Sequence, residues 1–237
     1  YIERDIDGPV RAAAADYLAA SPDEIALTTS TTAGLGLVYG GLDLAAGDVV
    51  VTTDHDFYST HEAPRRAAAR SGATIEQIPL YDDPSAADAT EIVERIVAAV
   101  TPATRAVAVT WVHSGTGVKL PLGDIAAAIA DYNDSTAPDR PVLLCVDGLH
   151  GFGVEDETAA SLGADVFVAG THKWLWGPRG TGIVWATGDA WQSINGTVPP
   201  FEQVHFDGWI NEMEPLPAPG GPANTPGGYA DFEHRMA

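Results

Sequence analysis

The chain has 237 residues, which is enough to bury a sizeable core, and its 45% hydrophobic and 19% charged residues are the balance of a globular protein. Its 33 acidic residues outnumber 12 basic ones and give a formal net charge of −21. This negative excess argues against nucleic acids and anionic membrane surfaces as partners.

Short β-like runs alternate with longer, alanine-rich runs of helical character along the chain. Several β-like runs are continuous Val, Ile and Leu, which is typical of strands buried on both faces. Strands and helices that alternate in this way predict a three-layer α/β/α fold around a mostly parallel sheet. The runs predict strands at residues 24–28, 48–53, 74–80, 105–112, 142–146, 165–169 and 182–186, and helices at residues 10–20, 33–42, 59–71, 87–100, 122–132 and 157–162.

The alternation stops after Trp191, and a segment rich in Pro and Gly at residues 215–228 excludes a helix or an interior strand. We therefore divide the chain into a large α/β domain, residues 1–195, and a Pro/Gly-rich region, residues 196–237. The single cysteine, Cys145, lies in an apolar run and is expected to be a buried thiol, so neither disulfides nor a metal site is expected. With no apolar run of roughly 20 residues and no signal-peptide pattern, we expect a cytoplasmic protein.

Ligands of parallel α/β sheets bind beyond the carboxyl ends of the strands, so the segments after the predicted strands are the candidate site. After the first strand, Ser30, Thr31 and Thr32 would lie at a helix N-terminus, where free N–H groups and the helix dipole favour a phosphate group. An ordinary N-cap is the alternative. The segments after later strands carry carboxylates, imidazoles and a lysine: Asp54-His55, His113-Ser114, Asp147-Gly148-Leu149-His150 and Thr171-His172-Lys173.

Lys173 is the sharpest of these candidates, because it is one of only two lysines and follows a predicted buried strand. A partly desolvated lysine has a lowered pKa and forms Schiff bases with carbonyl groups. A carboxylate such as Asp147 can pair with a pyridinium nitrogen, which keeps that ring an electron acceptor. A phosphate seat, an aspartate and a lysine together indicate pyridoxal-phosphate chemistry.

The order of these motifs resembles that of the class V aminotransferase family of fold-type I pyridoxal-phosphate enzymes. The nearest branch contains isopenicillin N epimerase-like proteins and the C–S lyases of the ergothioneine pathway. The resemblance implies the fold-type I large domain, pyridoxal 5′-phosphate as cofactor and an amino-acid-like small molecule as substrate. It covers nearly the whole chain through residues 30–34, 54–55, 147–150, 171–173, 177–182 and 224–228.

The resemblance also implies a role for each candidate residue. Lys173 would form the Schiff base and move the substrate proton, Asp147 would pair with the pyridine nitrogen, and His150 would lie beside the phenolic oxygen. His55 would stack on the cofactor ring, with Phe57 as the alternative. The other implied roles are phosphate contacts and substrate-side lining: Thr31, Thr32 and His172 on the phosphate, Thr225 on the phosphate of a neighbouring subunit in a homodimer, and His113 or Ser114 on the substrate side.

The chain departs from the family pattern at several points. Family members usually carry a smaller C-terminal domain with an arginine for the substrate carboxylate, and the resemblance implies that this domain is absent from these 237 residues. Gly170 stands where cysteine desulfurases have a phosphate-binding serine, and Asn224 stands where an arginine is often found. Cys145 lies in a predicted strand, which argues against cysteine desulfuration.

Several reactions of this family need the same lysine and aspartate and differ in their substrate contacts. From the resemblance we expect aminotransfer first, and C–S lysis by β-elimination or epimerisation second. A non-catalytic scaffold domain that keeps the fold is the alternative from another functional class.

Overall fold

The computed structural model describes residues 2–136 and 140–198 of the chain. The predicted region at residues 196–237, with Thr225, therefore lies almost wholly outside the described residues, and its role stays a prediction. The described helices are α1 (Ile2–Leu18), α2 (Thr31–Gly41), α3 (Tyr58–Ser71), α4 (Ala89–Ala99), α5 (Leu122–Thr136) and α6 (Gly188–Gln192), with 3₁₀ turns at Pro22–Glu24 and Pro84–Ala86. The described strands are β1 (Ile25–Thr28), β2 (Val49–Thr53), β3 (Thr74–Ile78), β4 (Thr104–Thr110), β5 (Leu143–Asp147), β6 (Val166–Gly170) and β7 (Gly182–Ala186).

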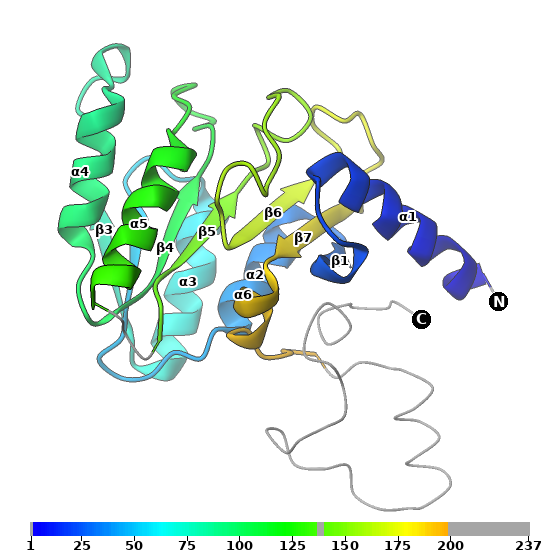
Figure 1. Cartoon of the computed structure of the whole chain (residues 1–237), viewed down its shortest axis with the longest axis horizontal. Coiled ribbons are helices and arrows are strands. Elements are labelled where there is room, and N and C mark those ends of the chain that lie inside the picture. Colours follow the sequence, from blue (N-terminus) through cyan, green and yellow to red (C-terminus); the bar gives the residue numbers. More distant parts are fainter. Residues whose placement is uncertain (1, 137–139, 199–237) are drawn as a thin grey trace, which may run out of the picture.

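The described strands form one seven-stranded sheet in the order β1-β7-β6-β5-β4-β2-β3 (Figure 1). The five strands β3, β2, β4, β5 and β6 run parallel to one another. The strand β7, in contrast, is antiparallel to both β1 and β6. The predicted mostly parallel sheet is confirmed. Because β7 runs in the opposite direction, β1 and β6 point the same way, and their last residues both pair with Gly182.

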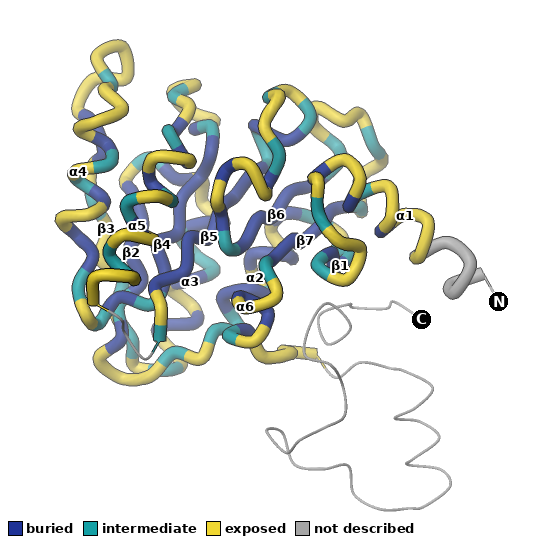
Figure 2. The backbone as a smooth tube through the Cα atoms, in the orientation of Figure 1, coloured by how far each residue is buried: buried dark blue, intermediate teal, exposed yellow. Residues whose placement is uncertain are grey.

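Two hydrophobic clusters cover the two faces of the sheet, and alternate residues of each central strand enter alternate clusters, as the pleat requires. One cluster takes residues from α1, α4 and α5, and the other takes residues from α2, α3 and α6. The strands β5, β6 and β7 are buried at every position and form the dark centre of Figure 2. The three-layer α/β/α prediction is therefore confirmed.

Local sequence explains where the helix that approaches the candidate site begins. The Ser30 hydroxyl caps α2 by accepting a hydrogen bond from the Ala33 N–H at 3.1 Å. The cap ends β1 and starts the helix at Thr31, two residues before the predicted start. The predicted hydroxyl-rich helix N-terminus is thus present.

The predicted helix at residues 157–162 is wrong, since this segment forms a turn. Thr158 and Ser161 bind each other's backbone N–H through their side chains, at 2.9 and 3.2 Å, and Gly163 follows with a φ of +68°. Such side-chain bonds compete with helical pairing, and the left-handed glycine ends the turn. The predicted strand at residues 105–112 also ends early, because Val112 turns away to bridge Lys119.

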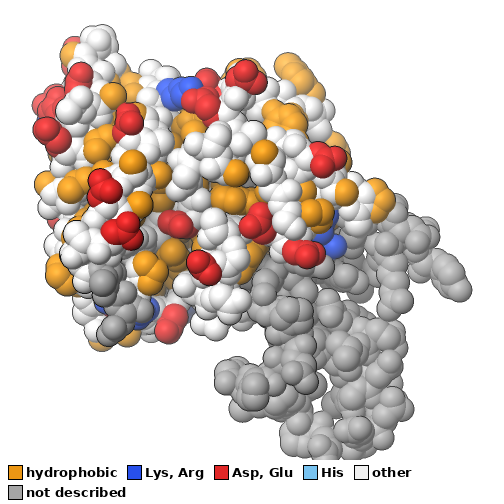
Figure 3. Space-filling model, viewed as in Figure 1, with side chains coloured by type: hydrophobic (Ala, Val, Ile, Leu, Met, Phe, Trp, Pro, Cys, Tyr) orange, Lys and Arg blue, Asp and Glu red, His pale blue; other side chains and the backbone are white. Residues whose placement is uncertain are grey.

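The molecular surface carries the charge expected from the composition. On the face shown in Figure 3, acidic side chains outnumber basic ones and are scattered rather than gathered in one patch. Among the described helices, none is both long and apolar enough to span a bilayer.

Candidate active site

The candidate site lies at the edge of the sheet where β2, β4, β5 and β6 end. Thr110, the last residue of β4, pairs with Asp147, the last residue of β5, and Asp147 in turn pairs with Val168 of β6. β1 ends at the same edge and leads into α2. The topology therefore brings to one edge the segments that the sequence singled out after these strands.

The start of α2 provides the candidate phosphate seat. Thr31 is buried, and its hydroxyl has no hydrogen-bond partner among the described residues, whereas Thr32 is exposed. The first N–H groups of a helix also lack partners within that helix. At Gly170 a Cβ atom would come within 3.1 Å of the Thr31 hydroxyl and 3.0 Å of His172 Nδ1, so a larger residue would crowd these two side chains.

Asp147 is the buried carboxylate of the site, with only 2% of its surface exposed. Its Oδ2 accepts a hydrogen bond from the Thr60 hydroxyl at 2.9 Å, and its Oδ1 accepts one from the Leu149 N–H at 3.1 Å. Burial raises the pKa of Asp147 to about 6, the two hydrogen bonds oppose this rise, and the negative charge of Asp56 adds to it. The two hydrogen bonds thus fix the position of the carboxylate, and a positive charge placed beside it would stabilise its ionised form.

Asp56 and Thr60 belong to the site, although the sequence reasoning gave them no role. Asp56 is buried and accepts hydrogen bonds from the backbone N–H groups of Thr53 and Thr110, at 2.8 and 2.7 Å. It thereby ties the end of β2 to the end of β4. Burial raises the pKa of Asp56, and these hydrogen bonds oppose the rise. The only sequence signal was the position of Asp56 shortly after a predicted strand, whereas Thr60 lay inside the predicted helix at residues 59–71.

His55, Tyr81 and His113 form an aromatic group beside these carboxylates. The His55 ring stacks on Tyr81 with centroids 3.8 Å apart and an interplanar angle of 8°, and His113 lies 5.6 Å from His55. Burial and the neighbouring His55 lower the pKa of His113 to about 4. The alternative stacking residue, Phe57, is 49% exposed, and Ser114 is exposed in the turn after His113.

Lys173 follows β6 on an exposed turn, where its backbone carbonyl accepts a hydrogen bond from the Trp176 N–H at 3.4 Å and its side-chain amine has no hydrogen bond or ion pair among the described residues. Its positive charge acts on His150, whose pKa is lowered first by burial and then by Lys173. The His150 ring meets Trp174 edge to face at 6.4 Å. The turn itself is held by bonds from the Gly177 N–H to the Thr171 carbonyl at 2.9 Å and between the Thr171 and Thr181 hydroxyls.

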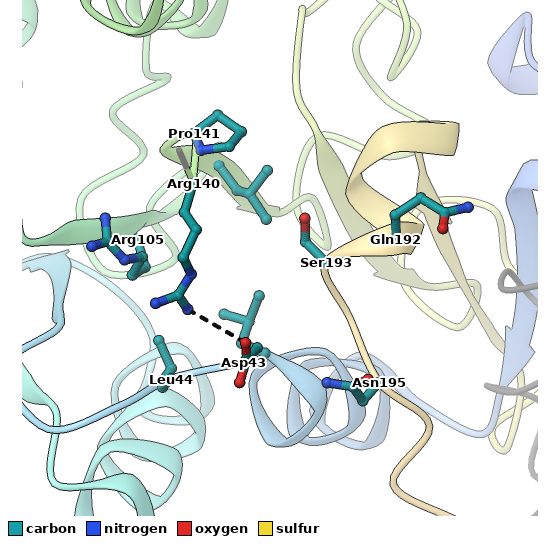
Figure 4. Close-up of a pocket in the computed structure, with 10 residues that line it drawn as sticks. Asp43, Leu44, Arg105, Arg140, Pro141, Gln192, Ser193 and Asn195 are labelled. Carbon is teal, nitrogen blue, oxygen red and sulfur yellow. Dashed lines mark ion pairs between the residues drawn. The ribbon is translucent and has the colours of Figure 1, made fainter. Parts of the chain in front are cut away.

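A cavity of about 300 Å³ lies at the opposite edge of the sheet, where β4 and β5 begin (Figure 4). Its two arginines, Arg105 and Arg140, each contact Asp48 at 3.0 Å, and Arg140 also faces Asp43 at 4.0 Å. These charges pair with one another. No residue predicted for the site lines this cavity, so we assign it no part in the candidate site.

Comparisons with known proteins identify the family to which the chain is similar. The family model of Aminotransferase class-V matches residues 8–230. The chain is 31% identical to an isopenicillin N epimerase of Amycolatopsis lactamdurans over 72% of this chain, and 29% identical to a cysteine desulfurase of Cronobacter sakazakii over 81% of this chain. It spans 41% and 44% of the lengths of these two relatives, which is less than half of each.

Solved structures of the cystine C–S lyase C-DES are similar to this chain. One, in complex with the reaction product cysteine persulfide, has a TM-score of 0.81 at 25% identity and covers 99% of this chain and 57% of that one. Another, a variant with glycine covalently linked to the PLP cofactor, has a TM-score of 0.80 at 26% identity, with 99% and 56% coverage.

Proposed function

The chain belongs to the class-V aminotransferase family, and on that premise we propose that it is part of a pyridoxal-phosphate-dependent lyase that breaks the C–S bond of a sulfur-containing amino acid. The observation that carries the proposal is the meeting of Asp147, Lys173 and the α2 N-terminus at one sheet edge. The similarity to the cystine C–S lyase over almost the whole chain supports the reaction type.

The described residues fit pyridoxal 5′-phosphate, the cofactor of this family. The unpartnered Thr31 hydroxyl and the α2 N-terminus suit the phosphate group, and the absence of a side chain at Gly170 leaves room beside them. Asp147 offers a buried anion to the pyridine nitrogen. When bound, the group supplies a protonated ring that accepts the negative charge developing at the substrate α-carbon.

The chain's own side chains divide the remaining work. The Lys173 amine would hold the cofactor covalently and then, once released by the substrate amine, move the proton at the substrate α-carbon. Asp147, ionised beside the ring nitrogen, would keep that nitrogen protonated. His150, kept neutral by burial and by Lys173, would lie beside the phenolic oxygen, and His55 would cover one face of the ring.

Cys145 bears on which reaction of the family is supported. It is the only cysteine in the 237 residues, it is buried in β5, and burial raises its thiol pKa far above its ordinary value. A thiol in that state is a poor nucleophile, so it cannot take sulfur from a substrate. Cys145 is therefore excluded as the thiol that would accept sulfur in a desulfuration, whereas elimination, in which sulfur leaves with its own product, needs no protein thiol.

A homodimer is part of the proposal. Trp176 is 84% exposed with a φ of +55°, and Trp174 and Leu175 beside it are also exposed, directly after Lys173. A monomer gains nothing from a strained, solvent-exposed tryptophan, whereas a second copy packed on this turn would bury it. In that dimer Thr225, which lies outside the described residues, would reach the phosphate of the neighbouring subunit.

Product analysis tests the proposal. Protein loaded with pyridoxal phosphate is incubated with cystine, and the products are separated. Elimination gives pyruvate, ammonia and cysteine persulfide, aminotransfer gives a keto acid that keeps its sulfur, and epimerisation gives the D-isomer. We expect pyruvate, which a Lys173→Ala variant forms more slowly by roughly a hundredfold or more. Bound cofactor without any product would instead support the scaffold alternative, and a sulfur-containing keto acid would support the aminotransferase.

A further inference from the structure

Tyr81 contacts two site histidines at once, although the sequence reasoning did not select it. It is 4% exposed and follows β3, which is an edge strand. Its ring stacks on His55, and its backbone carbonyl accepts a hydrogen bond from His55 Nε2 at 3.2 Å. The carbonyl has no proton to give, so His55 carries its proton on Nε2. Tyr81 therefore covers one face of the His55 ring, and only the other face is left to stack on a cofactor ring.

The Tyr81 hydroxyl makes a second set of contacts. It lies 2.8 Å from His113 Nδ1 and 2.8 Å from the Thr116 hydroxyl. His113 and Thr116 are held in one tight turn, in which the His113 carbonyl accepts from the Gly117 N–H at 2.7 Å and the His113 N–H donates to Val118 at 2.9 Å. The hydroxyl is thus the middle member of a fixed chain of hydrogen bonds.

The direction of these hydrogen bonds decides which ring nitrogen of His113 carries the proton. Thr116 Oγ1 already accepts from the Val118 N–H at 3.4 Å, so its own proton is free to go to the Tyr81 oxygen. Tyr81 then donates to His113 Nδ1. In this order each hydroxyl donates within the chain, and the neutral imidazole must carry its proton on Nε2. In the reverse order Thr116 would accept two bonds and leave its proton to solvent.

His113 Nε2 has no partner among the described residues, although His113 is only 1% exposed. A buried N–H donor without an acceptor is unfavourable, and such groups in native proteins call for a ligand or a function. Its neighbour His55 is a predicted ring-stacking residue, so the unpaired donor lies within the candidate site.

We propose that Tyr81 is a positioning residue of the site: its ring supports His55 from behind, and its hydroxyl holds His113 in the Nε2–H tautomer, so that this N–H is offered to an oxygen of a bound ligand. The role toward a ligand rests on the proposed function. The tautomer is a property of the protein alone, so the two claims fail separately.

The first test reads the tautomer in cofactor-free protein. The ¹⁵N chemical shifts of the histidine ring nitrogens distinguish Nδ1–H from Nε2–H, and a His113→Gln variant assigns the signal. We expect Nε2–H in the unaltered chain and a mixture of tautomers in Tyr81→Phe, which keeps the ring and removes only the hydroxyl. Tyr132→Phe, on α5, is the matched control and leaves the signal unchanged. An Nδ1–H signal in the unaltered chain, or no change in Tyr81→Phe, overturns the proposal.

Thr116→Val tests the direction of the hydrogen bonds that run from Thr116 through Tyr81 to His113. This test does not require the Tyr81 variant to fold. If Thr116 donates to Tyr81, the loss of its hydroxyl leaves the Tyr81 bond to His113 intact, and the tautomer stays Nε2–H. If the chain ran the other way, Tyr81 would lose its acceptor and the His113 signal would change, which contradicts the proposal.

The last readout is the affinity for pyridoxal phosphate, measured from its visible absorbance during titration. We expect Tyr81→Phe to weaken binding by roughly two- to tenfold, the effect of one misplaced hydrogen bond. Affinity equal to that of Tyr132→Phe would remove the role toward the ligand while leaving the tautomer result in place. Failure of every variant and of the unaltered chain to bind the cofactor would contradict the proposed function instead.

Discussion

The Thr60 hydroxyl donates a hydrogen bond of 2.9 Å to Asp147 Oδ2 across 87 residues of sequence, and both side chains are buried. Thr60 lies in the first turn of α3, and Asp147 ends β5. The bond therefore links a helix of one face directly to the central carboxylate. It fixes which Asp147 oxygen is occupied and stabilises the ionised form, against the effect of burial.

Thr60→Val is expected to destabilise the protein by about 1–3 kcal/mol at neutral pH, because a buried carboxylate oxygen loses its partner while the side-chain shape is kept. The measurement is the free energy of unfolding in urea. Thr52→Val is the matched control, since the buried Thr52 hydroxyl has no partner among the described residues. Its loss is expected to be neutral or stabilising, and equal effects of the two substitutions would argue against the assigned bond.

Asp147 and His113 are expected to give the stability of the cofactor-free protein opposite dependences on pH. The pKa of Asp147 rises from 3.8 to about 6 on folding, so the folded state holds more protons in that range and stability falls as pH rises from about 4 to 6. The pKa of His113 falls from 6.5 to about 4, so the unfolded state holds more protons and stability falls as pH drops through the same range.

Unfolding free energies of Asp147→Asn and His113→Gln at several pH values separate these two effects. Relative to the unaltered chain, Asp147→Asn gains roughly 2–3 kcal/mol between pH of about 4 and 6, and His113→Gln loses a similar amount. Both slopes should level off above pH of about 7. Slopes of the same sign in the two variants would contradict the burial of one of these groups in its uncharged form.

Lys173→Ala is expected to abolish the covalent link to pyridoxal phosphate and to lower turnover by roughly a hundredfold to ten-thousandfold, since it removes the proton-moving amine. Borohydride reduction followed by peptide mass analysis locates the link. The control is Lys119→Arg at the only other lysine, where a cation preserves the ion pairs with Glu155 and Glu157. A cofactor-bearing peptide that contains residue 119 would disprove the assignment of Lys173.

Trp176→Ser is expected to shift a dimer toward the monomer, because it removes the most exposed large apolar side chain of the Lys173 turn. Light scattering over a dilution series measures the change. High salt should strengthen the dimer, as it screens the repulsion between two chains of net charge −21. Val97→Ala, on the exposed side of α4, is the control, and an equal shift in both variants would show no special role for Trp176.

The central fold followed from sequence because the buried strands are continuous apolar runs, and a helix comes after β1, β2, β3, β4 and β7. Val166–Gly170 and Gly182–Ala186 are buried at every residue, and both were predicted within one residue of their observed bounds. The position of the catalytic candidates followed in turn, since parallel strands present their carboxyl ends at one edge. The direction of β7 did not follow, because a buried strand reads the same whichever way it runs.

The parts that sequence could not supply depend on contacts between distant segments. Tyr81 and Thr60 looked like an ordinary loop tyrosine and a helical threonine. Only the pairing of β3, β2, β4 and β5 in one sheet brings Tyr81 to His113 and Thr60 to Asp147. The turn at Thr158 was mistaken for a helix because paired side-chain bonds to the backbone leave no periodic signal.

The antiparallel strand β7 has a consequence for how the protein is made. It is the piece that joins β1 to β6, and Trp185 on it donates a hydrogen bond to Glu24 across 161 residues. Closure of so long a loop is entropically costly, so the edge that carries α2 is expected to join the sheet late in folding. In a nascent chain the end of β5 and the turn after β6 come together when these two strands pair, whereas the candidate phosphate-binding helix α2 is expected to join them only after β7 has left the ribosome.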